Sequence, residues 1–208
     1  LFEIMEVASR ADLKSDLLQE LERQKQVLRA FRNNPEISEE ALNQVLADME
    51  RASSALFGMT GRIGQYLREN EWLISLRGRL VVPGGGTQVD MPSFHSWQSL
   101  PDERRQADLQ RWISTLMPVQ IGIAIVLRLL RESGEAVKAV APQGAYQQML
   151  AGKTYQLLRV WIDDAAGVFP EISANKYMVW IRYSTQQGDQ RPQAVAQDVA
   201  FKMTLCAL

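Results

Sequence analysis

The sequence predicts an α+β fold, with an all-helical domain over residues 1–135 followed by an antiparallel, sandwich-like β-sheet domain over residues 136–208. Two observations predict this division. Before residue 135 the apolar residues recur at the spacing of one helix face. After Gly134 they alternate with other residues, as in half-buried strands. Helices that come first and strands that follow are typical of the α+β class.

The first long helix is predicted to begin near residue 13 and to have one apolar side. The residues of that side are Leu13, Leu17, Leu18, Leu21, Leu28 and Phe31. Pro35 ends the helix, because proline lacks a backbone N–H and opposes helical geometry. Ser38 is then expected to cap a second helix, with Glu39 and Glu40 at the positive end of its dipole. Gly58 ends this second helix.

Helical spacing continues over residues 63–76 and stops at residues 80–86. The stop is expected because Pro83 and three consecutive glycines oppose a helix. Pro101 begins a further helix, since proline is tolerated at the first helical position. Residues 119–130 are apolar almost all round, which predicts a helix packed on several sides.

Four strands are predicted in the C-terminal domain. The clearest are residues 177–183 and 199–205, where the side chains alternate in character. Residues 154–162 are rich in β-forming residues, and residues 136–141 make a shorter strand. The connections are too short for crossover helices, so the sheet is expected to be antiparallel.

The composition limits the classes of function. The 208 residues include 23 basic and 24 acidic side chains, a net charge of -1, which disfavours a nucleic-acid-binding module that acts through bulk charge. Cys206 is the one cysteine and His95 the one histidine, so an intramolecular disulfide and a zinc site built from such residues are excluded. A single cysteine fits a reducing compartment.

No membrane span or secretion signal is expected. The longest mainly apolar run, residues 117–127, is too short to cross a bilayer. No basic segment followed by an apolar one opens the chain. The chain begins without Met and within sequence that is already helical, so we expect the natural protein to carry further N-terminal residues.

Three features were tested for catalysis or ligand binding. The glycines from Gly84 to Gly86 lack the Lys-Ser/Thr pair of a P-loop and the third glycine of a dinucleotide fingerprint, which favours a tight turn. His95 is expected to be structural, hydrogen-bonded at a domain junction. Asp163 and Asp164 are typical of a solvated turn. We therefore expect no catalytic residue, metal or cofactor; the alternative is a small enzyme that uses the Gly84–Gly86 loop and His95.

Basic residues gather between Arg51 and Arg79. This stretch holds five arginines and two glutamates, a local net charge of +3. Arg62 and Arg68 lie at a helix turn with Gly61 and Gly64, where a partner could approach the backbone. The planar guanidinium suits paired contacts with carboxylates. The alternative is a solvated helix face held by ion pairs within the helix.

The tryptophans are expected to be mainly core residues, although tryptophan is also frequent at the centre of interfaces. They are Trp72, Trp97, Trp112, Trp161 and Trp180. Cys206 lies in a predicted strand, where it is expected to serve as a small apolar side chain.

The stretches RIGQYLRE at residues 62–69, VPGG at 82–85 and DMPSFHSW at 90–97 occur in an unusual order and spacing. Together they resemble the ZapD family of bacterial cell-division proteins. Weaker likeness extends to residues 17–21, 169–173 and 181–183. The resemblance therefore covers nearly the whole chain, without an N-terminal segment that members of the family normally carry.

The resemblance implies a non-enzymatic, cytoplasmic homodimer without cofactors, made of a helical dimerisation domain and a β domain. It implies that the protein binds the C-terminal tail of FtsZ, the tubulin-like division protein. It also implies that the protein bundles FtsZ filaments and so stabilises the Z-ring at midcell. Neither nucleic acid nor a membrane is expected as a partner.

Basic residues at matching positions are implied to hold the FtsZ tail. These residues are Arg10, Arg62, Arg68, Arg77, Arg79, Lys176 and Arg182. Two positions depart from the family, since Glu71 and Met178 stand where a member can carry arginine. Arg182 is expected to point away from the β core and to meet Arg62 and Arg68 where the two domains join.

Overall fold

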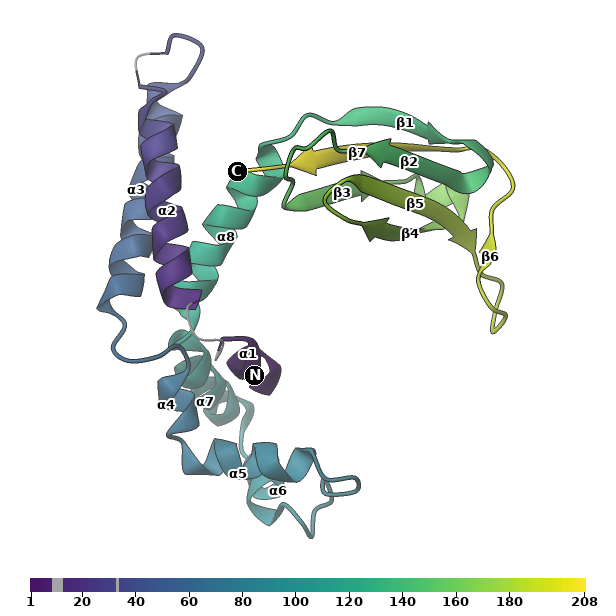
Figure 1. Cartoon of the computed structure of the whole chain (residues 1–208). Helices are drawn as coiled ribbons and strands as arrows, with labels where there is room; N and C mark the ends of the chain where they lie inside the picture. Colours follow the sequence, from purple (N-terminus) through teal and green to yellow (C-terminus); the bar gives the residue numbers. More distant parts are fainter. Residues whose placement is uncertain (9–12, 33) are drawn as a thin grey trace. The chain divides into compact units, whose positions relative to one another are not determined.

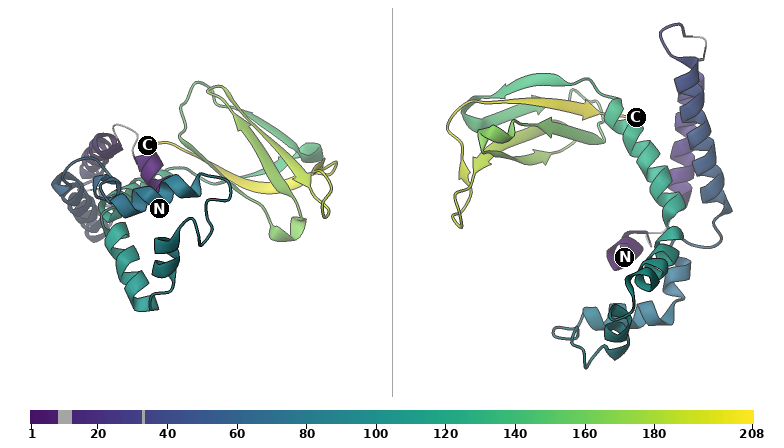
Figure 2. Two further views of the ribbon diagram at one scale, coloured as in Figure 1. Left: turned by 90° about the horizontal axis from the view of Figure 1, so that it is seen from below. Right: turned by 180° about the vertical axis from the view of Figure 1, so that it is seen from behind.

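The computed structural model describes residues 1–8, 13–32 and 34–208 (Figures 1 and 2). The chain divides into two compact units, Leu1–Val126 and Leu127–Leu208. We call them the helical unit and the β unit. Helices occupy the first unit and antiparallel sheets the second, which confirms the predicted α+β class.

The helical unit is built from short and medium helices. They are α1 (Phe2–Ala8), α2 (Leu13–Arg29), α3 (Glu39–Gly58), α4 (Gln65–Arg68), α5 (Glu71–Leu80), α6 (Pro92–Gln98) and α7 (Asp102–Ser114). Helix α8 (Met117–Glu132) begins in this unit and ends in the β unit. The longest two, α2 and α3, lie side by side as an antiparallel pair (Figures 1 and 2).

The α2–α3 pair follows the predicted apolar pattern in part, because Phe31 lies beyond the end of α2 and is 42% exposed. Leu17 and Leu21 of α2 are buried, as are Met49 and Leu56 of α3. The hydroxyl of Ser38 accepts a hydrogen bond from the backbone N–H of Ala41 at 3.3 Å, which confirms the predicted cap. Helix α3 ends at Gly58, as expected.

Helix α8 packs closely against this pair. A Cβ atom on Gly122 would come within 2.8 Å of Leu17 Cδ2 and 3.0 Å of Leu56 Cδ1, so only glycine allows this approach. Val119 and Ile125 are buried as well. Ile121, in contrast, is 43% exposed, so one side of the helix remains open.

The stretch predicted as helical over residues 63–76 is two helices rather than one. Asn70 separates them, because its side chain accepts a hydrogen bond from the backbone N–H of Leu73 at 3.1 Å and so caps α5. Gly64, with φ of 73°, stands in the left-handed region just before α4. The predicted break after α5 is confirmed as a series of turns over residues 81–90.

The β unit contains two antiparallel sheets, as predicted (Figure 1). Its strands are β1 (Val137–Ala141), β2 (Ala145–Met149), β3 (Leu157–Trp161), β4 (Phe169–Ala174), β5 (Met178–Thr185), β6 (Gln193–Ala194) and β7 (Val199–Cys206). One sheet has the order β1-β7-β3, and the other has the order β2-β5-β4, with β6 paired to β5.

The buried core of the β unit comes from the inward faces of both sheets. Ile181 and Tyr183 of β5 pack in one cluster with Phe201 and Met203 of β7. The ring centroids of Tyr183 and Phe201 lie 5.4 Å apart. The predicted alternation in both strands is therefore confirmed, and each sheet has an outer face directed away from this core.

Strands β2 and β4 were not predicted. Both are edges of their sheet, with β5 between them. Strand β2 has the sequence AYQQM and β4 has FPEISA, which includes Pro170. Edge strands tolerate proline and polar residues because one side of their backbone makes no ladder hydrogen bonds. Such strands therefore lack the apolar alternation that identified β5 and β7.

Candidate functional site

Strand β5 presents Trp180 and Arg182 on the outer face of its sheet. Val179, Ile181 and Tyr183 are buried in the core, whereas Arg182 is exposed and Trp180 is 39% exposed. Successive side chains of a strand point to opposite faces, so this arrangement follows directly from the alternation. The prediction that Arg182 points away from the β core is confirmed.

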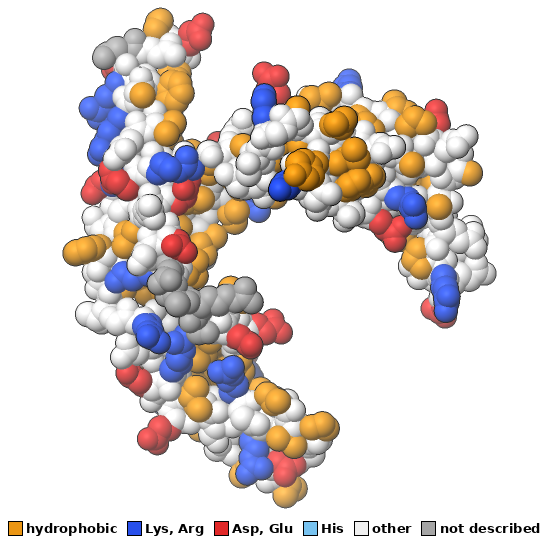
Figure 3. Space-filling model, viewed as in Figure 1, with side chains coloured by type: hydrophobic (Ala, Val, Ile, Leu, Met, Phe, Trp, Pro, Cys, Tyr) orange, Lys and Arg blue, Asp and Glu red, His pale blue; other side chains and the backbone are white. Residues whose placement is uncertain are grey.

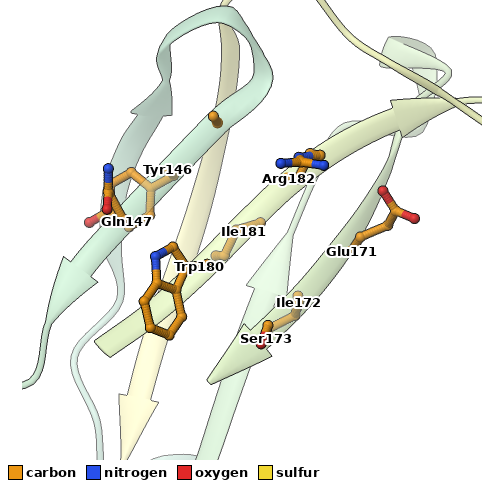
Figure 4. Close-up of a pocket in the computed structure, with 9 residues that line it drawn as sticks. Tyr146, Gln147, Glu171, Ile172, Ser173, Trp180, Ile181 and Arg182 are labelled. Carbon is orange, nitrogen blue, oxygen red and sulfur yellow. The ribbon is translucent and has the colours of Figure 1, made fainter. Parts of the chain in front are cut away.

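These two side chains lie in a hollow of about 610 Å³, which we call the Arg182 groove (Figure 4). Its lining residues are Ala145, Tyr146, Gln147, Glu171, Ile172, Ser173, Trp180, Ile181 and Arg182. In the ladder, Arg182 stands between Ala145 of β2 and Glu171 of β4. Since alanine is small, it leaves the guanidinium uncovered on the β2 side.

The cross-strand neighbour Glu171 does not neutralise Arg182. No ion pair joins the two side chains within the described part of the chain. The Glu171 carboxylate instead accepts a hydrogen bond from the Ser184 hydroxyl at 2.7 Å. Ser184 is buried, which fixes the position of this contact. Among the described residues, the Arg182 guanidinium therefore has no acidic partner.

Lys176 lies in the turn that leads into β5. Its Nζ atom is 4.8 Å from the ring centroid of Tyr177, and Tyr177 is 63% exposed. The side chain of Asn175 accepts hydrogen bonds from the backbone N–H groups of Tyr177 at 2.8 Å and Met178 at 3.0 Å, and so holds the turn. Met178 is half-buried at the start of the strand.

The predicted basic residues of the helical unit differ in their contacts. Arg68 donates hydrogen bonds to the backbone oxygens of Ile63 at 3.1 Å and Met5 at 3.4 Å, so it ties α1 to α4. Arg77 forms an ion pair with Glu6 at 3.8 Å.

Arg62 and Arg79 are exposed, while Arg10 lies outside the described residues. The four arginines from Arg62 to Arg79 belong to the helical unit, and Lys176 and Arg182 belong to the β unit. The predicted meeting of Arg62 and Arg68 with Arg182 stays a prediction. The alternative of ion pairs within one helix is not what Arg77 shows, since Glu6 stands on another helix.

The glycine loop is a turn, as predicted. Gly84 has φ of 77°, and a Cβ atom on Gly85 would come within 2.4 Å of the Arg79 backbone oxygen. Thr87 and Asp90 hydrogen-bond each other through their side chains and hold the loop from within. The positive φ and the close approach account for Gly84 and Gly85 without a bound phosphate.

The prediction for His95 is wrong. Its side chain is exposed, and within the described residues His95 forms hydrogen bonds only through its backbone. Two tryptophans perform the expected structural task instead. The indole N–H of Trp72 donates to the Ser93 hydroxyl at 3.1 Å, and that of Trp97 donates to the Asp108 carboxylate at 3.0 Å. The indoles therefore connect α6 to α5 and α7.

The tryptophans fall into two groups. Trp72, Trp97 and Trp112 form one cluster, with ring centroids 5.7–5.9 Å apart. Trp112 is buried, as expected for a core residue, whereas Trp72 and Trp97 are half-buried. Trp161 and Trp180 are 37% and 39% exposed on the outer faces of the two sheets, so their assignment to the core is wrong. The alternation itself signalled this for Trp180, because Trp180 and Arg182 share one parity in β5.

The remaining expectations concern metals, membranes and the lone cysteine. Within the described residues, no group of three or more His, Cys, Asp or Glu side chains could hold a metal ion. No single described helix is long and apolar enough to span a membrane, although α7 and α8 together, with a bend of 62° between them, have sufficient length and apolar character. Asp163 caps a short turn, and Cys206 is fully buried, both as predicted.

Comparison with known proteins identifies close relatives. Residues 1–182 match the family model "ZapD: Cell division protein". The chain is 59% identical to the cell division protein ZapD of Bordetella petrii over 207 residues, which cover 100% of this chain and 82% of that protein. It is 55% identical to the ZapD protein of a Janthinobacterium strain, over 100% of this chain and 82% of the relative. The ZapD protein of Ralstonia nicotianae is 52% identical over 99% of this chain and 82% of its own length.

Proposed function

Because the chain belongs to the ZapD family of cell division proteins, we propose that it is a non-enzymatic, cytoplasmic factor that binds the C-terminal tail of FtsZ. In this proposal it cross-links FtsZ filaments and so stabilises the Z-ring at midcell. The role in cell division follows from the family. The observation that best supports tail binding is the exposed, unneutralised Arg182 beside Trp180 in the Arg182 groove.

The Arg182 groove offers two kinds of contact to a peptide. The Arg182 guanidinium can donate paired hydrogen bonds to a carboxylate, each worth roughly 1.5–3 kcal/mol before screening by salt. Trp180, on the same face, provides apolar area to an adjacent side chain of the peptide. A shallow groove with one cation and one aromatic ring suits weak, reversible binding of an extended tail.

The other proposed tail-binding residues are expected to contribute to binding in different ways. Lys176 and the exposed Arg62 and Arg79 supply positive charge near the surface. Arg68 and Arg77 hold neighbouring helices through the contacts described above, so their replacement is expected to affect stability as well as binding. Arg10 is retained as a proposed contact on the basis of the family pattern.

Bundling requires at least two tail-binding sites in one particle, which a homodimer provides. We propose that the helical unit forms the dimer, because it exposes large apolar side chains. Phe57 is 80% exposed, Val81 78% and Val89 88%. Figure 3 shows hydrophobic side chains at the surface of this unit. Light scattering should give the mass of a dimer; a monomer at every concentration would contradict this part of the proposal.

The substitution Arg182→Glu tests the proposed groove. The charge reversal should weaken binding of a fluorescent FtsZ tail peptide by about tenfold or more, measured by anisotropy at low salt. The fold should persist, because Arg182 is exposed. The control is Arg191→Glu, an identical charge change in an exposed loop after β5.

The control variant should bind the peptide within about twofold of the parent. If Arg182→Glu binds as tightly as the parent, the tail binds elsewhere. If both variants weaken binding equally, the effect comes from net charge rather than from the groove.

A further inference from the structure

The outer face of the other sheet, β1-β7-β3, carries a second arrangement of basic and aromatic side chains. In the ladder, Lys138 of β1 stands opposite Lys202 of β7, and Lys202 stands opposite Trp161 of β3. These three residues form a row across the sheet. Arg159 and Val140 lie on the same face. We call the surface formed by these five residues the Trp161 face.

Two cations hold the Trp161 ring. The guanidinium carbon of Arg159 is 4.4 Å from the ring centroid, and Lys202 Nζ is 5.3 Å from it. Arg159 is fixed further, since its Nη1 donates a hydrogen bond to the backbone oxygen of Arg131 at 2.8 Å. The ring is thus positioned by groups with a full positive charge, which attract the negative face of an indole.

The positive charge of this face has no acidic partner within the described β unit. Lys138 and Lys202 are exposed and form no ion pair there. Like charges directly opposite on neighbouring strands destabilise a sheet. Asp163 lines the same hollow, of about 660 Å³, but its carboxylate accepts a hydrogen bond from the backbone N–H of Ala165 at 3.0 Å. An acidic group from outside the chain would relieve the repulsion between the two lysines.

The face also offers apolar contacts. Val140 is 50% exposed and Trp161 37%. Ala200, on β7, lines the hollow between them. A ligand for this surface therefore needs both negative charge and apolar side chains.

We propose that the Trp161 face is a binding site for an acidic peptide segment of a partner protein. Carboxylates of the segment lie between Lys138 and Lys202, and its apolar side chains pack on Val140 and the edge of Trp161. Nucleic acid fits less well, because its bases bind proteins by stacking on free aromatic rings, and the face of this ring is already occupied by Arg159 and Lys202.

This site is separate from the Arg182 groove. The two sheets enclose one core, so their outer faces point in opposite directions. If both sites are occupied, one β unit binds two peptide segments, one on the outer face of each sheet. The proposal does not require that FtsZ is the partner, and it stands or falls independently of the function proposed above.

The test uses the indole N–H signals of the whole, ¹⁵N-labelled protein in two-dimensional NMR. The probe is a short synthetic peptide of alternating Asp and Leu residues. The signals of Trp161 and Trp180 are assigned from the variants Trp161→Phe and Trp180→Phe. Saturable movement of the Trp161 signal is expected, and Trp180 reports the Arg182 groove in the same spectrum.

The double variant Lys138→Glu/Lys202→Glu should lower the peptide affinity measured at Trp161 by at least about tenfold. The matched control, Lys153→Glu/Arg191→Glu, changes the same net charge at exposed positions away from both faces and should bind like the parent. Spectra of both variants verify that the fold persists.

Three outcomes would overturn the inference. One is a Trp161 signal that does not move when the peptide is added, whatever Trp180 does. Another is a lysine double variant that binds as the parent does. The last is a single-stranded oligonucleotide that displaces the peptide at equal concentration, because the face would then bind anions without preference for peptide. A moving Trp161 signal with a static Trp180 signal would support this site and count against the Arg182 groove.

Discussion

Positively charged side chains are used differently in the helical unit and in the β unit. Among the described residues, the ion pairs lie in the helical unit, where Arg23, Arg51, Arg105 and Arg111 each bind an acid three positions away. The cation–aromatic contacts lie in the β unit, on Trp161 and Tyr177. Figure 3 shows blue and red side chains close together along the helical unit.

The periodicity of each element explains the difference. Residues three or four positions apart are neighbours on a helix, so a local acid can neutralise each base. On a strand, the neighbours of a side chain come from other strands, and those of Lys202 are a lysine and a tryptophan. Positive charge therefore remains available on the sheets, whereas most of that on the helices is neutralised within the chain. This contrast is why the Arg182 groove and the Trp161 face, both on the β unit, are the centres of the two proposals, with Arg62 and Arg79 of the helical unit as additional proposed contacts.

The largest change in the free energy of unfolding is expected at Lys25, which joins α2 to α3. Its Nζ lies 2.6 Å from Glu22 and 2.9 Å from Glu50, and its side chain is only 6% exposed. Burial alone would lower the pKa of Lys25, but hydrogen bonds to Glu22 and Glu50 outweigh it and raise the pKa. Lys25→Glu would place three carboxylates together and should cost about 3 kcal/mol of the free energy of unfolding, measured in urea.

Arg29→Glu is the matched control on the same helix. Arg29 is half exposed and lies 3.8 Å from Glu22, so its reversal should cost under about 1 kcal/mol. Tail affinity should be unchanged in both variants at temperatures where they are folded. A loss of affinity in folded Lys25→Glu would show that a base held in ion pairs with Glu22 and Glu50 also binds the tail, and the contrast between the units would fail.

A smaller change in the free energy of unfolding, this time a stabilisation, is expected in the β unit. Tyr183 is fully buried, and its hydroxyl has no hydrogen-bond partner among the described residues. Tyr183→Phe removes this unsatisfied group and should raise the free energy of unfolding by about 1 kcal/mol. A destabilised variant would mean that a bound water or another group satisfies the hydroxyl.

The same substitution should alter the response to alkaline pH. Burial raises the pKa of Tyr183 to about 12. In the unfolded chain the phenol ionises near its ordinary value of about 10, so ionisation favours unfolding once the pH exceeds that value. The parent should therefore lose stability between about pH 10 and pH 12 through this group, and the Phe variant should lose less.

Much of the fold could be predicted from the sequence, because strong periodicity and caps are local signals. Ser38, the apolar stripe of α2 and the alternation in β5 and β7 each specified their element. Strands β2 and β4 could not be predicted, since their strand conformation depends on pairing with β5 rather than on their own residues. The split between α4 and α5 followed from the cap at Asn70, which the apolar spacing concealed.

Less of the candidate site could be predicted. The outward direction of Arg182 followed from alternation within β5, and Trp180 could have been assigned to the groove by the same rule. The neighbours Glu171 and Ala145 depend on strand register, which no local pattern specifies. Likewise, the contacts of Arg68 could not be predicted, because it donates to backbone oxygens in α1 and in the turn before α4. Backbone acceptors leave no signal in the sequence, so Arg68 was predicted to bind a partner.

Co-sedimentation with FtsZ filaments tests the central claim most directly. The parent protein should bring intact FtsZ filaments into a low-speed pellet as bundles. It should leave filaments of FtsZ without its C-terminal tail in the supernatant, and Arg182→Glu should bundle the intact filaments poorly. Bundling of tailless filaments to the same extent as intact ones would contradict the account.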